Sequence, residues 1–79
     1  MVADNQWRKR ITADPEIHHG DPCIAGTRVS VSVIVGSIAD GDTFDQILAG
    51  YPQLKREDIS AALQFAAEAV NRFDVLLNR

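Results

Sequence analysis

Four potential metal ligands lie close together in a segment that contains proline and glycine. They are His18, His19, Asp21 and Cys23. A zinc site built from such residues usually combines two ligand pairs or uses a helical i, i+4 pair, and this segment has neither. Two adjacent histidines in an extended segment also point to opposite faces. We therefore predict a polar turn with a small buried cysteine, and no metal site.

The residues Cys23 and His19 also raise the question of nucleophilic catalysis. A nucleophile–base pair needs a third group that orients the base and donors that stabilise an oxyanion, and neither is recognisable here. Residues 20–26 contain glycines but lack the spacing and the lysine of a phosphate-binding loop. The sequence therefore predicts that the chain is not an enzyme and has no catalytic residue and no cofactor.

The tripeptide Gly26-Thr27-Arg28 allows two interpretations. Gly26 permits an unusual backbone angle, Thr27 can close a turn through its hydroxyl, and Arg28 presents a forked donor. In the functional interpretation, Arg28 binds a phosphate or the carboxylate of a partner. In the structural one, it holds a strand to an acidic helix end, or to Asp14 or Glu16. The sequence leaves both open.

The basic cluster Arg8-Lys9-Arg10 stands out in an acidic chain. The 79 residues include 8 Lys and Arg against 11 Asp and Glu, for a net charge of −3. Such a chain can bind nucleic acid only through a local basic patch. The cluster ends a polar segment, residues 1–10, which we expect to be a flexible tail. It is either a solvated tail or a contact for an acidic partner.

Length and composition exclude several classes of protein. A chain of 79 residues has room for one small domain, and a partner that covers more apolar surface would stabilise it. No apolar run reaches the roughly 20 residues of a membrane-spanning helix. The N-terminus has no apolar region typical of a secretory signal. With a single cysteine, which favours a reducing compartment, we expect a cytoplasmic protein without a membrane partner.

The elements that must position these residues are short strands followed by helices. Residues 7–12 are compatible with a short strand, and residues 11–30 contain strands and turns, the last strand ending near Val29. Ser30 is then the N-cap of a helix that ends near Asp40. The helical core therefore spans residues 31–79.

Two further helices complete this core. Thr43 and Gln46 have the spacing of a capping box, which begins a second helix that ends before Pro52. A third helix runs from about Arg56 to Leu77, about 33 Å at 1.5 Å per residue. The sequence thus predicts a mainly α domain with short N-terminal strands, three helices and a tight turn between the last two. That is the helix-turn-helix layout.

The third helix carries more apolar surface than two short helices can cover. Its surplus consists of Phe65, Ala69, Phe73 and Leu76. A second copy of the chain would cover such a surface, so we predict a homodimer through these residues. The alternative is that the helix folds back onto the N-terminal strands.

Five sequence blocks, in order and spacing, resemble a known family. They are Asp14-Pro15-Glu16-Ile17, Gly20-x-Pro22-x-Ile24-x-Gly26-Thr27-Arg28-Val29, Gly41-x-Thr43-x-x-x-Ile47, Tyr51-Pro52-x-Leu54 and Asp58-Ile59-x-Ala61-Ala62-Leu63. The chain resembles the bacterial and archaeal domain-of-unknown-function family 433, which is similar to homeodomain-like helix-turn-helix proteins. The resemblance implies a VapB-type antitoxin that inhibits a PIN-like nuclease and binds its own operator DNA. A dimerising adaptor that has lost DNA binding is the alternative.

Within that resemblance, five residues are candidates for DNA binding and three for the nuclease. Arg28, Lys55 and Arg56 supply charge for phosphates, while Ser60 and Gln64 lie on the polar face of the third helix. Arg8, Lys9 and Arg10 complement the acidic site of a PIN-like nuclease. Relatives place Thr or Ser where this chain has Lys55, a poor N-cap, so Glu57 and Asp58 must support the start of the helix.

Overall fold

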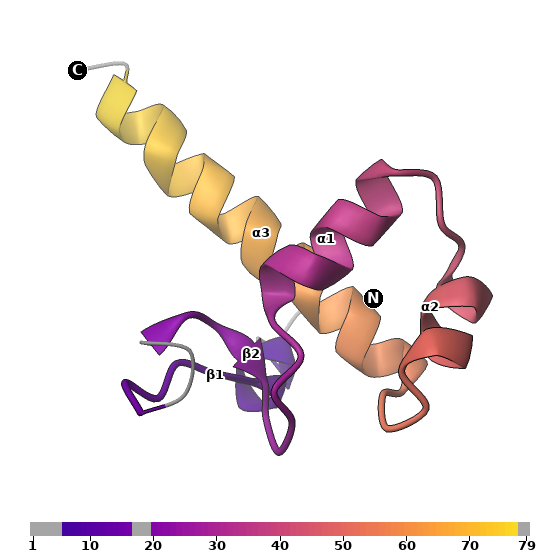
Figure 1. Ribbon diagram of the computed structural model, residues 1–79. Helices are drawn as coiled ribbons and strands as arrows, with labels where there is room; N and C mark the ends of the chain where they lie inside the picture. Colours follow the sequence, from indigo (N-terminus) through magenta and orange to yellow (C-terminus); the bar gives the residue numbers. More distant parts are fainter. Residues whose placement is uncertain (1–5, 17–19, 78–79) are drawn as a thin grey trace.

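The structure is a computed structural model that describes residues 6–16 and 20–77, with side chains as far as Arg72. In the described part of the chain, a 3-10 helix and two short strands precede three α-helices (Figure 1). They are η1 (Gln6–Arg10), β1 (Ile11–Thr12), β2 (Cys23–Ile24), α1 (Val31–Ala39), α2 (Phe44–Gly50) and α3 (Arg56–Leu77). The mainly helical class, with short strands first and a long last helix, is confirmed.

The N-terminal region differs from the prediction. Residues 6–10, expected as the end of a tail or as part of a strand over residues 7–12, form η1. The strand is limited to Ile11–Thr12, which pairs antiparallel with Cys23–Ile24. The physical reason is that side chains of η1 contact α3, Trp7 with Phe65 and Arg10 with Asp58. Such contacts are not visible as a local sequence pattern.

The loop before α1 replaces the predicted strand that ended near Val29. After β2 ends at Ile24, the backbone turns at Gly26, whose φ is +80°, so that the Ile24 N–H donates to the Val29 carbonyl at 2.9 Å. The Thr27 hydroxyl donates to the Ile24 carbonyl at 2.8 Å and accepts from the Val29 N–H at 3.0 Å. Thr27 thus closes the turn, as predicted from its hydroxyl.

The helix boundaries follow the predicted caps. The Ser30 hydroxyl accepts from the Val33 N–H at 3.2 Å and begins α1. In α2, both halves of the predicted capping box are present: Thr43 Oγ1 accepts from the Gln46 N–H at 3.1 Å, and Gln46 Oε1 accepts from the Thr43 N–H at 2.7 Å. These bonds satisfy backbone donors that a helix start leaves free.

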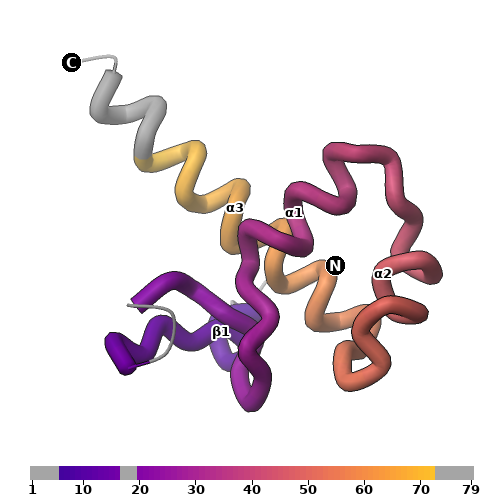
Figure 2. Tube along the Cα trace, in the orientation of Figure 1, coloured from indigo at the N-terminus to yellow at the C-terminus, as the bar shows by residue number. Residues whose placement is uncertain are grey.

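The core lies between α1, α2 and the first half of α3, with β2 and the loop after it closing one end. Its buried members are Ile24, Val29, Val31, Ile34, Ile47, Leu54, Ile59 and Ala62. Beyond this core, α3 continues away from α1 and α2 (Figure 2). Among the described residues, none of the helices is both long and apolar enough to cross a membrane.

Candidate functional site

A buried carboxylate joins the N-terminal segment to the start of α3. Asp58, in the first turn of α3, is 7% exposed. Its Oδ2 accepts from the Lys55 N–H at 2.9 Å and its Oδ1 accepts from Arg10 Nη1 at 2.9 Å. Asp58 therefore supplies the capping that Lys55 cannot, as predicted for the acidic first turn, and also binds η1 to α3.

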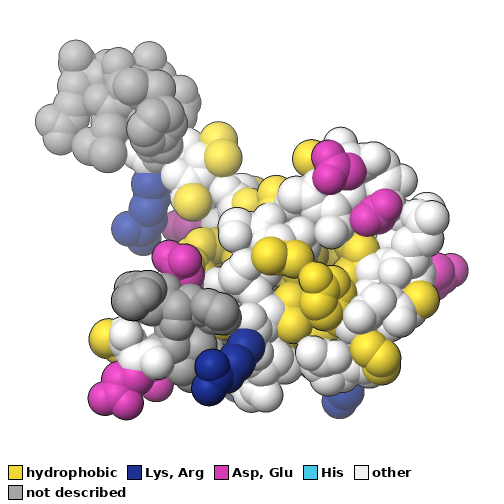
Figure 3. Space-filling view, in the orientation of Figure 1, with side chains coloured by type: hydrophobic (Ala, Val, Ile, Leu, Met, Phe, Trp, Pro, Cys, Tyr) yellow, Lys and Arg dark blue, Asp and Glu magenta, His cyan; other side chains and the backbone are white. Residues whose placement is uncertain are grey.

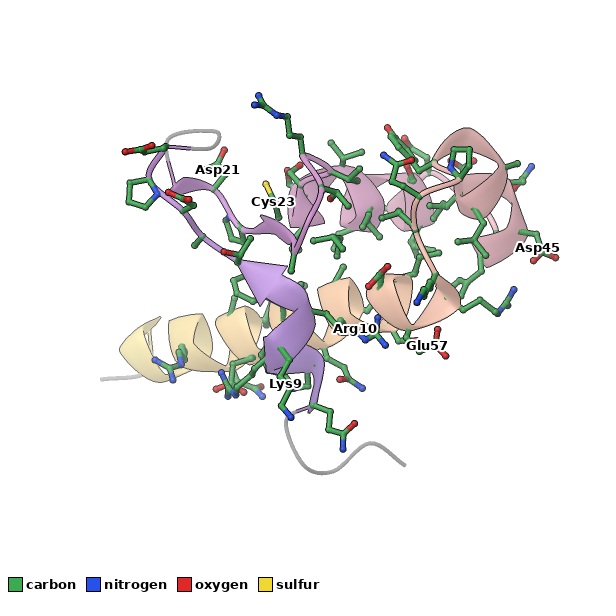
Figure 4. The ribbon with its side chains drawn as sticks, turned by 90° about the horizontal axis from the view of Figure 1, so that it is seen from below. Lys9, Arg10, Asp21, Cys23, Asp45 and Glu57 are labelled. Atoms are coloured by element: carbon green, nitrogen blue, oxygen red, sulfur yellow. The ribbon has the colours of Figure 1, made fainter. Side chains whose placement is uncertain are left out.

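The basic cluster is distributed over η1 and has partners on α3. Arg10 forms an ion pair with Asp58, and Figure 4 shows the Arg10 side chain directed from η1 to the first turn of α3. The Arg8 guanidinium lies 4.4 Å from the centre of the Trp7 ring and 3.8 Å from Glu68, and both partners of that ion pair are about half exposed. Lys9 is exposed. The three cations do not form the tail that the sequence predicts.

The Trp7 ring packs edge-on against Phe65 of α3, with ring centres 6.1 Å apart. One member of the predicted dimer interface therefore has a contact within the chain, with η1 and not with the N-terminal strands that the alternative interpretation named. Ala69 is exposed. The side chains of Phe73 and Leu76 lie outside the described residues.

Three of the predicted DNA-binding residues lie together on α3, and we call Arg56, Ser60 and Gln64 the reading face. With Trp7 and other residues of η1 and α2, they line a hollow of about 280 Å³. The Arg56 guanidinium pairs with Asp45 of α2 at 2.8 Å and lies 5.2 Å from the centre of the Phe44 ring. The Gln64 Oε1 is buried and has no hydrogen-bond partner among the described residues.

The remaining two candidates are placed differently. Lys55 is exposed at the turn between α2 and α3, directly before Arg56. Arg28 lies on the loop after β2, where it is exposed and lines hollows shared with Gln53. It does not line the hollow of the reading face. The structure therefore divides the predicted DNA-binding set between two places.

Of the four potential metal ligands in residues 18–23, only Asp21 and Cys23 lie within the described part of the chain. Within that part of the chain, no three His, Cys, Asp or Glu side chains converge on a possible ion site, while His18 and His19 lie outside it. Cys23 is buried, as predicted, with its Sγ 3.5 Å from the Asp21 carbonyl. Burial, and secondarily the Asp21 carboxylate, raises the pKa of the Cys23 thiol. The thiol therefore stays protonated and weakly nucleophilic near neutral pH.

An apolar groove lies where α3 leaves the body, on the side of α1. Its volume is about 400 Å³, and Asp21 and Ser32 are its polar members. Its apolar lining is Pro22, Val31, Val35, Phe65, Ala66, Ala69 and Val70. Hydrophobic side chains are visible on the surface of α3 in this region (Figure 3), and Val70 is 64% exposed. The contribution of α1 to this groove was not predicted, because α1 was assigned to the core alone.

These features define a small, mainly helical domain whose long helix carries a polar reading face in its first half and an apolar groove at its middle. Residues 11–66 match the family described as "Protein of unknown function (DUF433)", and the chain belongs to this family. This confirms the family resemblance recognised in the sequence.

Two similar proteins extend the comparison. The uncharacterized protein y4eO of Sinorhizobium fredii is 36% identical over 59 residues, which are 75% of this chain and 27% of that protein. The chain thus spans about a quarter of that relative's length. A crystal structure of a DUF433 member protein from Anabaena variabilis superposes with a TM-score of 0.74 at 28% identity. The match covers 89% of this chain and 69% of the Anabaena chain, so the two proteins share their fold over most of this chain.

Proposed function

We propose that this protein is a non-catalytic regulator of the antitoxin type, which binds a PIN-like nuclease and, through α3, its own operator DNA. The observation that carries the DNA-binding part is the reading face. Arg56, Ser60 and Gln64 lie four residues apart along α3, which follows α2 across a short turn, and they line one hollow. In a helix-turn-helix, the second helix inserts side chains placed in this way into the major groove.

Two residues of the reading face, Arg56 and Gln64, have side chains whose chemistry suits contact with DNA. Arg56 and neighbouring Lys55 approach phosphates, while the Gln64 amide can make a paired hydrogen bond with adenine. The charges nearby oppose tight binding, because Asp45 already pairs with Arg56 and Glu57 is exposed beside it. We therefore expect weak binding by the isolated chain that is lost near physiological salt, where the Debye length is about 8 Å. Assembly with the nuclease would strengthen binding by placing several reading faces on one duplex.

Contact with the nuclease is assigned to the exposed cations of η1. Arg8 and Lys9 face solvent, and an ion pair as exposed as that of Arg8 with Glu68 contributes about 0–1 kcal/mol, so an acidic partner can replace it. Arg10, in contrast, is held by a buried carboxylate and is a structural residue. Of the three predicted partner-binding residues, we therefore keep Arg8 and Lys9 in the proposal and leave out Arg10.

The test combines co-purification with two binding measurements. A small nuclease with an acidic site is expected in the adjacent reading frame, and it should co-purify with this chain and be inhibited by it. Fluorescence anisotropy on the upstream DNA, with and without the nuclease, should show tighter binding by the complex. A complex that never binds this DNA overturns the operator role, and a nuclease that stays active with excess chain overturns the antitoxin role.

A dimerising adaptor without DNA binding is the second candidate. The apolar groove between α1 and α3 favours it, because α3 continues beyond this groove and a second copy of α3 could lie in it. Two antiparallel copies of α3 that cross near Ala69 would each place their last turns over the groove of the other, which is the self-complementarity of a two-fold interface. The adaptor role predicts a dimer that does not bind the operator at low salt.

A further inference from the structure

The N-terminal 3-10 helix lies along the same side of α3 as the reading face. Gln6, Trp7 and Arg10 of η1 line the hollow that also contains Ser60 and Gln64. A helix that enters the major groove must approach the base edges within hydrogen-bond distance, and a groove about 12 Å wide accommodates one helix. With η1 in this position, α3 cannot bring Ser60 and Gln64 to a base pair.

The two ends of η1 are held with unequal strength. At its C-terminal end, Arg10 binds the buried Asp58 at 2.9 Å, and β1 follows directly, paired with β2. At its N-terminal end, the contacts of Trp7 with Phe65 and of Arg8 with Glu68 are on the surface, and all five residues of this described element are at least partly exposed. Short 3-10 helices also have poor hydrogen-bond geometry. The segment can therefore separate from α3 at Trp7 while Arg10 stays in place.

The covered state leaves one polar atom unsatisfied. The Gln64 Oε1 is buried without a hydrogen-bond partner among the described residues, which opposes closure because water would satisfy that oxygen. Closure is favoured by the Trp7–Phe65 contact and the Arg8–Glu68 pair. A segment can alternate between two positions when the interactions that favour each position are weak, as they are here.

We propose that η1 is an autoinhibitory strap over the reading face, hinged at the Arg10–Asp58 ion pair. When the strap opens in the isolated chain, Ser60 and Gln64 become accessible, and Arg8, which has no nuclease to contact there, is released from Glu68 to contact a phosphate. Phosphate competes with Glu68 for Arg8, so DNA itself favours the open position. This inference rests on the proposed DNA-binding function and adds its regulation.

Two variants open the strap without removing a residue of the reading face or a cation. Trp7→Ala deletes the ring contact with Phe65, and Glu68→Gln removes the carboxylate partner that Arg8 shares with Arg72. An aromatic contact of this kind changes an equilibrium by roughly 2- to 10-fold, and the apparent affinity for DNA should rise by up to that factor. Glu16→Gln is the matched control for charge, because Glu16 is an exposed carboxylate on the loop between β1 and β2.

The experiment measures DNA binding and the strap separately. Anisotropy at low salt should give tighter binding for Trp7→Ala and Glu68→Gln than for the wild type and Glu16→Gln. Trp7 is the single tryptophan, so acrylamide quenching reports the strap directly and should increase in Glu68→Gln and on adding DNA to the wild type. Circular dichroism checks that each variant is folded.

The outcomes separate the strap from the function on which it rests. If all four proteins bind the operator with the same affinity, or if Trp7 is quenched equally in the free and the DNA-bound wild type, the strap is wrong and the operator role stands. If none of them binds at low salt although quenching shows that Glu68→Gln has opened, the DNA-binding function itself is overturned.

Discussion

The two halves of α3 both carry apolar residues but have different surroundings. In the first half, Ile59 is fully buried and Ala62 packs beside it in the core, Asp58 is buried, and Ser60 and Gln64 share a hollow with η1. In the second half, Val70 is 64% exposed, and the helix continues beyond α1 and α2 (Figure 1). An isolated helix of ten or so residues is marginal in water. The first half is therefore an element of the fold, while the second half depends on the first or on a partner.

The largest expected effect is a difference in the stability lost when a residue is substituted in the first or in the second half of α3. Ile59→Ala removes a fully buried side chain and should lower the free energy of unfolding by about 2–5 kcal/mol. Val70→Ala, in the exposed half, should change it by less than about 0.5 kcal/mol. Urea denaturation followed by circular dichroism measures both, at low temperature if the first variant is too unstable. Equal losses would mean that the second half of α3 is packed as tightly as the first.

The second expected effect concerns the start of α3. Asp58→Ala removes the acceptor of the Lys55 N–H and leaves Arg10 without its partner, so the free energy of unfolding should fall by about 2–3 kcal/mol. Glu57→Ala, at the exposed neighbouring position, should cost less than about 0.5 kcal/mol. Thermal and urea unfolding provide the measurement. If the two variants lose the same stability, the capping and the ion pair of Asp58 contribute little.

The sequence predicted the helices well because their signals are local. A capping box and an N-cap serine are recognisable from residues three apart, and all three of their hydrogen bonds are present in the structure. The buried cysteine and the turn at Gly26 were also predicted from local chemistry. Family membership followed from the spacing of five blocks, and the match over residues 11–66 confirms it.

The placement of η1 could not be predicted in the same way. Arg10 and Asp58 are 48 residues apart, and nothing in either local sequence indicates the other. Three cations in succession are typical of an exposed tail, which is how the sequence was interpreted. A weak signal was available: Trp7, a large aromatic residue beside these cations, needs a packing partner, and Phe65 provides it. The same contact explains why Phe65 is not fully available to a dimer.

The third expected effect tests the groove at the middle of α3. Ala69→Glu places a carboxylate in the apolar lining and should raise the dimer dissociation constant at least about 10-fold, because a charge would be buried without a partner. Ala49→Glu is the control, since Ala49 is an exposed alanine on α2. Sedimentation equilibrium over a micromolar range measures both. A wild type that is monomeric throughout this range overturns the homodimer, and equal weakening by both variants would place the interface elsewhere.

The smallest expected effect compares two arginines, one in each half of α3. Arg56 lies on the reading face, and its pair with Asp45 is so exposed that its loss should change the free energy of unfolding by about 0.5 kcal/mol or less. Arg56→Ala should therefore leave the fold intact and reduce the slope of log affinity against log salt by about 0.9, the value for one phosphate contact. Arg72→Ala removes an arginine of the second half that is also exposed and pairs with Glu68, and it should leave the salt slope unchanged. Anisotropy on operator and unrelated DNA from low to physiological salt measures the slopes.

The same measurement separates phosphate contacts from base contacts. Arg56→Ala should lower the affinity for both DNAs alike, whereas Gln64→Ala should change which sequence is preferred, because only base contacts carry sequence information. A salt slope reduced equally by the two arginine variants would mean that DNA contacts both halves of α3. DNA binding would then not be confined to the first half of the helix, which carries the reading face.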